Sequence, residues 1–115
     1  MSRDDTFLED ILNSARIIRE YLSGVALESF LANTEKQDAV NRRFEIMGEA
    51  TRHLSPSVRQ ALPEIPWTLM TGMRNILIHD YDEVDPKRVW ETAQNDLPTL
   101  ISRLEKYLAD ASPID

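Results

Sequence analysis

The chain has 115 residues, 42% of them hydrophobic and 29% charged, which is typical of one globular domain with a modest core. Its net charge of −7 argues against a protein that coats nucleic acids nonspecifically. The absence of cysteine excludes disulfides and thiolate metal sites and fits a reducing cytoplasm, where we expect the protein to act.

No membrane association is expected. The sequence has no run of about 18 apolar residues that could span a bilayer. Its first ten residues are too acidic and too polar for a signal peptide.

The apolar residues of the first third recur every three or four positions, which predicts an amphipathic helix. They are Leu8, Ile11, Leu12, Ala15, Ile18 and Leu22. Thr6 and Glu9 form a capping box that predicts its start, and Gly24 suits the position just past its end.

A second helix is predicted from Thr34, with Gln37 completing another capping box, to about Leu54. Its expected buried stripe consists of Val40, Phe44, Met47, Thr51 and Leu54. Ser55 followed by Pro56 is a cap with proline at the first helical position, so a short helix over 56–62 follows.

The next long helix begins near Trp67, after Pro63 and Pro66, and is expected to end between His79 and Tyr81. An acidic loop follows, and Asp85-Pro86 then predicts the start of another helix. Pro98 should divide this element into 86–96 and 98–110. The sequence therefore predicts one all-α domain over 1–115, an up-and-down bundle of four to five helices.

Two glycines, Gly48 and Gly72, fall inside predicted helices, where each costs about 1 kcal/mol relative to alanine. The usual reason for such a glycine is the close approach of another backbone. We therefore expect close crossings at both positions, within the bundle or between subunits.

The stretch "GMRNILIHDY" places an arginine in an apolar run. On a helical wheel, Arg74 lies within an arc formed by Trp67, Met70, Leu77, Ile78 and Tyr81. A buried arginine needs a carboxylate partner, for which Glu49 is the candidate, or an anionic ligand. Residues 40–79 carry a net charge of +2 against −9 elsewhere, which is compatible with a phosphate site or with ordinary scatter.

Asn75 and His79 lie on a second, polar stripe with Thr68 and Gly72. Arg74 and His79 can therefore serve one site only if the helix unwinds near His79 or a second copy of the chain supplies one of them. The plainer interpretations stay open: His79 as a helix cap, Arg74 as a structural ion pair and Tyr81 as a rim aromatic.

The residues "RNILIHDY" read as R-x4-H-x-Y, which resembles the motif of the HepT-like toxin branch of the HEPN superfamily. The segments "FEIMGEATRHLS", "PEIPWTLMTGMRNILIHDY" and "VDPKRVWETAQNDLPTL" resemble that family in the same order. The resemblance implies a homodimeric helical bundle and a metal-independent endoribonuclease without a cofactor, with Arg74 and His79 of both chains in one cleft. Asn75 matches the supporting polar position.

The resemblance also implies a partner, an MntA-type nucleotidyltransferase antitoxin that transfers AMP to Tyr81. The residue types agree with this chemistry, because histidine can move protons at neutral pH and arginine can hold a phosphorane. Two other hypotheses remain: a noncatalytic helical dimer that binds and positions a nucleotidyltransferase or its nucleotide, and a structural oligomerisation module.

Overall fold

The computed structural model describes residues 2–111, which form α-helices and one 3₁₀ helix and contain no strand, so the all-α prediction is confirmed. The long helices are α1 (Arg3–Tyr21), α3 (Thr34–Arg52), α5 (Trp67–His79), α6 (Pro86–Asn95) and α7 (Leu97–Ala111). The short elements are α2 (Leu27–Leu31), α4 (Pro56–Ala61) and the 3₁₀ helix η1 (Tyr81–Glu83). Residue 1 and residues 112–115 of the predicted domain lie outside this range.

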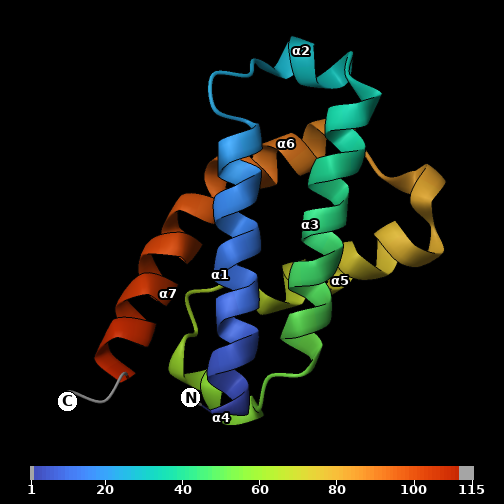
Figure 1. Ribbon diagram of the computed structural model, residues 1–115. Coiled ribbons are helices and arrows are strands. Elements are labelled where there is room, and N and C mark those ends of the chain that lie inside the picture. Colours follow the sequence, from blue (N-terminus) through green and yellow to red (C-terminus); the bar gives the residue numbers. More distant parts are fainter. Residues whose placement is uncertain (1, 112–115) are drawn as a thin grey trace.

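Two antiparallel helices, α1 and α3, form the centre of the bundle (Figure 1). The last helix, α7, packs along the other side of α1, and α6 lies across the same end of the bundle as α2 (Figure 1). Helix α5 crosses α3 obliquely and packs mainly on it. One side of α5 is thus fixed to α3, while much of the opposite side faces outward.

A single apolar core joins these helices. Its largest fully buried side chains are Leu8, Ile11, Ile18, Phe30, Val40, Met47, Leu62, Leu97, Leu100 and Leu104. The buried stripes predicted for the first two long helices are confirmed, including Thr51, whose hydroxyl donates to the Met47 carbonyl at 2.8 Å.

The start of the first helix was predicted wrongly. Helix α1 begins at Arg3, and its capping box uses Ser2 and Asp5 instead of Thr6 and Glu9. The Ser2 hydroxyl accepts from the Asp5 N–H at 3.1 Å, and the Asp5 carboxylate accepts from the Ser2 N–H at 3.4 Å. The acidic first turn also complements the positive end of the helix dipole, which favours the earlier start.

The second predicted capping box is also wrong. Helix α3 does begin at Thr34, but Asn33 caps it by accepting from the Lys36 N–H at 2.9 Å. The Gln37 amide instead donates to the Phe30 carbonyl at 2.9 Å and so holds the end of α2. Helix α2 was not predicted, because its five residues are too few to show a periodic pattern.

The remaining boundaries agree closely with the predictions. Gly24 adopts the expected positive φ, 71°, just after α1. Asp85 caps α6 by accepting from the Lys87 N–H at 3.0 Å. The break near Pro98 falls slightly earlier than predicted, since α6 ends at Asn95 and α7 begins at Leu97.

Candidate functional site

Helix α5 carries most of the predicted site, and the structure shows which side of it is buried. Trp67, Met70 and Leu77 are buried, as the helical wheel indicates. Ile78 and Tyr81 were expected in the same apolar arc but are exposed, at 45% and 48%. The arc predicted from periodicity is therefore wider than the surface that α3 covers.

The crossing of α5 over α3 centres on Gly48. A methyl group added at this glycine would overlap the side chain of Arg74 and lie 2.9 Å from the Met70 carbonyl oxygen. The close approach predicted at Gly48 is thus confirmed, and it places the stem of Arg74 directly against the α3 backbone. A methyl group added at Gly72 would meet no atom beyond its own helix within 4 Å among residues 2–111, so no crossing in the described bundle explains this glycine.

Arg74 is held by two neighbours. Its Nη2 lies 3.0 Å from Glu49 Oε2, and its Nη1 donates to Asn75 Oδ1 at 2.9 Å. The side chain is 15% exposed, and its Nε is buried without a partner among the residues described. The expected pairing with Glu49 is confirmed, and it fixes the guanidinium in one orientation at the edge of α3.

Glu49 is shared among three cationic or potentially cationic groups. Arg52 and His53 each lie 3.3 Å from its carboxylate, in addition to Arg74. Burial raises the pKa of this carboxyl, but the hydrogen bond with His53 and the charges of Arg52 and Arg74 outweigh that effect and lower it.

His79 is the last residue of α5 and is exposed. The helix is continuous up to this point, and the N–H of the following residue, Asp80, still bonds to the Ile76 carbonyl at 2.8 Å. Unwinding near His79 is therefore not observed. Within one chain, Arg74 pairs with Glu49 of α3 and with Asn75, while His79 is exposed at the end of α5, and among the described residues no hydrogen bond or ion pair joins the two catalytic candidates.

Tyr81 belongs to η1, and its hydroxyl is tied to α3. The hydroxyl donates to Asp38 Oδ1 at 2.5 Å and accepts from Asn41 Nδ2 at 3.4 Å. The hydrogen bond to Asp38 raises the pKa of the Tyr81 phenol, so the hydroxyl keeps its proton at neutral pH. Asp38 and Asn41 were not among the predicted site residues, because the contact spans about forty residues of sequence and no local spacing signals it.

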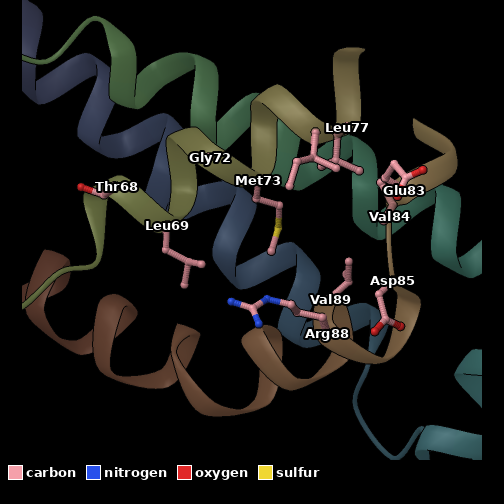
Figure 2. A pocket seen from close by; sticks show the side chains of 11 residues that line it. Thr68, Leu69, Gly72, Met73, Leu77, Glu83, Val84, Asp85, Arg88 and Val89 are labelled. Atoms are coloured by element: carbon pink, nitrogen blue, oxygen red, sulfur yellow. The ribbon is translucent and has the colours of Figure 1, made fainter. Parts of the chain in front are cut away.

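An apolar pocket of about 290 Å³ lies on the other side of α5, between this helix, η1 and the start of α6 (Figure 2). It is lined by Thr68, Leu69, Gly72, Met73, Ile76, Leu77, Glu83, Val84, Asp85, Arg88 and Val89. Figure 2 shows Arg88 extending beneath Met73. None of the predicted site residues lines it, so the pocket is separate from Arg74, His79 and Tyr81.

Two further observations concern the described residues. Between residues 2 and 111, no group of three or more histidine, aspartate or glutamate side chains is arranged to hold a metal ion. None of the helices in this range is long and apolar enough to cross a bilayer.

Comparison with known proteins gives a consistent result. A protein of Thermococcus cleftensis described as a probable ribonuclease HepT is 39% identical over 100 residues, covering 87% of this chain and 91% of its own length. A candidate RNase of Methanocaldococcus jannaschii is 37% identical over 107 residues, covering 91% and 98%. No solved structure matches significantly. The family model described as ribonuclease HepT-like matches residues 11–107, and the chain therefore belongs to the HepT-like family of the HEPN type.

Proposed function

We propose that this protein is an endoribonuclease that cleaves RNA without a metal ion and acts as the toxin of a toxin–antitoxin pair. The observation that carries the proposal is the position of Arg74 on α5. Glu49 of α3 and Asn75 orient its guanidinium, and the helix that carries Arg74 ends in the exposed His79. Membership of the ribonuclease HepT-like family supports the same reaction.

The active species is a homodimer in which Arg74 and His79 of both chains line one cleft. Two large apolar side chains of α5 are exposed, Ile76 at 44% and Ile78 at 45%, and they support this assembly. Large apolar side chains exposed together on one helix are typical of a surface that a partner covers. A second copy packed against α5 would also supply a second His79 to the site.

The cleavage uses acid–base chemistry on the RNA itself. One His79 removes the proton of the 2′-hydroxyl, which attacks the adjacent phosphorus, and the other His79 protonates the departing 5′-oxygen. Arg74 stabilises the negative charge that develops on the phosphorane oxygens. Glu49 and Asn75 engage two of the five N–H donors of the guanidinium, which leaves others for the phosphate.

An MntA-type nucleotidyltransferase is the proposed antitoxin, and Tyr81 is the residue it modifies. Tyr81 is exposed in the short element that follows His79, which makes its hydroxyl accessible from the end of α5. An AMP group on this oxygen would add a phosphate that competes with RNA for Arg74 and fills the cleft.

A direct test is incubation of the purified protein with end-labelled RNA, with and without an excess of EDTA. We expect cleavage at an unchanged rate in EDTA, with products that end in 2′,3′-cyclic phosphate, because the attacking oxygen belongs to the RNA. Loss of cleavage in EDTA and its recovery with Mg²⁺ would contradict the metal-independent mechanism. Nucleotide binding without any RNA turnover would instead favour the noncatalytic helical dimer.

A further inference from the structure

The Asp38 carboxylate accepts a hydrogen bond from the Tyr81 hydroxyl, whose proton must leave when Tyr81 accepts a nucleotide. This hydrogen bond is 2.5 Å long, and Asp38 lies on α3, more than forty residues from Tyr81 in the sequence. Both side chains are exposed to solvent. The contact therefore forms where a second protein can reach it, instead of within the core.

We propose that Asp38 is the general base for nucleotide transfer to Tyr81, and this inference rests on the proposed modification by AMP. The phenolic oxygen attacks the α-phosphorus of ATP and forms the new P–O bond. The bond between the α-phosphorus and its bridging oxygen breaks, and pyrophosphate leaves with that electron pair. The phenolic proton passes to Asp38, which releases it to water.

The hydrogen bonds around the hydroxyl suit this role. A tyrosine hydroxyl has one hydrogen to donate and two lone pairs. The hydrogen points to Asp38, and the distant amide of Asn41 engages one lone pair at 3.4 Å. One lone pair remains for the phosphorus, so the base and the nucleophile are already arranged before the nucleotide arrives.

A base is needed because the phenol does not ionise by itself. The hydrogen bond to Asp38 raises the pKa of Tyr81, so the phenolate is scarce at neutral pH. A carboxylate that takes the proton while the P–O bond forms avoids the free phenolate altogether. The same contact thus makes the resting hydroxyl less acidic and supplies the acceptor that the transfer requires.

The product cannot restore the contact. Once the oxygen carries AMP, it has no hydrogen to donate, and the phosphodiester brings a negative charge next to Asp38. Like charges at this distance repel, so the modified side chain is expected to leave α3. Release from Asp38 frees the adduct to move towards the cationic cluster around Glu49, further along α3.

The experiment follows transfer of radiolabelled AMP from ATP to the protein by a purified MntA-type nucleotidyltransferase. Tyr81→Phe identifies the acceptor and should take up no label. Asp38→Asn keeps the shape of the side chain but removes the base, so kcat should fall by about a hundredfold or more while the KM for ATP changes little. Asp38→Ala should behave in the same way, which keeps the test decisive if the asparagine variant folds poorly.

The matched control is Asp82→Asn. Asp82 lies next to Tyr81 in η1 and is exposed, so its removal takes away a nearby negative charge without removing the hydrogen bond. This variant should accept AMP at nearly the rate of the wild type. Equal rates for wild type, Asp38→Asn and Asp38→Ala would overturn the role of Asp38 and leave the modification of Tyr81 intact. A wild-type protein that takes up no label would overturn both.

Discussion

His79→Ala is expected to lower the rate of RNA cleavage by at least about a hundredfold, because a proton transfer assisted by a side chain contributes roughly 10²–10⁴ in rate. In the proposed dimer this single substitution removes both the base and the acid. Arg74→Ala should lower the cleavage rate by about a hundredfold or more, because no cation then stabilises the negative charge on the phosphorane. Initial rates on a defined RNA, with circular dichroism to confirm folding, measure both effects.

The chain supplies matched controls for both substitutions. His53 is its other histidine, and His53→Ala removes an imidazole that contacts Glu49 and stacks on Phe7 at 5.0 Å. Arg52→Ala removes a cation that pairs with the same carboxylate as Arg74. Both control variants should keep most of the activity. If they lost as much activity as His79→Ala and Arg74→Ala, general damage to α3 and α5 would explain the results better than catalysis.

Gly48→Ala is expected to destabilise the protein by about 1–3 kcal/mol, although alanine is the better helix former. The added methyl group would overlap the Arg74 side chain and press on the Met70 carbonyl, so α5 must move away from α3. Urea unfolding followed by circular dichroism measures the loss as a lower midpoint at an unchanged m-value. The same shift displaces Arg74, so cleavage should fall as well.

Gly72→Ala is the control for this prediction, since a methyl group there meets no other element in the described part of the chain. Because alanine has the higher helix propensity, this substitution should leave the free energy of unfolding unchanged or raise it by up to about 1 kcal/mol. A loss of stability at Gly72 that grows as the protein is diluted would instead report a contact between subunits. A Gly48→Ala variant as stable as the wild type would contradict the close crossing.

The long helices could be predicted because each repeats its apolar residues over several turns. Where two capping patterns overlap, periodicity does not decide between them, and helix α1 is capped by Ser2 with Asp5 instead of Thr6 with Glu9. The five residues of α2 carry no periodic signal at all. Local patterns therefore predicted the bundle, but not the details that depend on competing caps or on a single turn.

The candidate site also has features that the sequence could predict and features that it could not. Arg74 and its partner Glu49 could be predicted because a cation in an apolar arc requires a carboxylate and few carboxylates lie in the surrounding segment. The exposure of Ile78 could not be predicted, because the periodicity of one helix does not show how much of its surface the neighbouring helix covers. The contact of Tyr81 with Asp38 depends on the path of η1 back to α3, which only the tertiary structure shows.

The shared cleft is tested most directly by mixing wild-type protein with a ninefold excess of the Arg74→Ala/His79→Ala double variant and allowing subunits to exchange. Native mass spectrometry confirms that mixed dimers form. A wild-type chain then meets a wild-type partner about one time in ten, so cleavage per wild-type chain should fall to roughly a tenth if each cleft needs both chains. Cleavage per wild-type chain that stays constant despite complete exchange would show that one protomer suffices and would contradict the two-chain site.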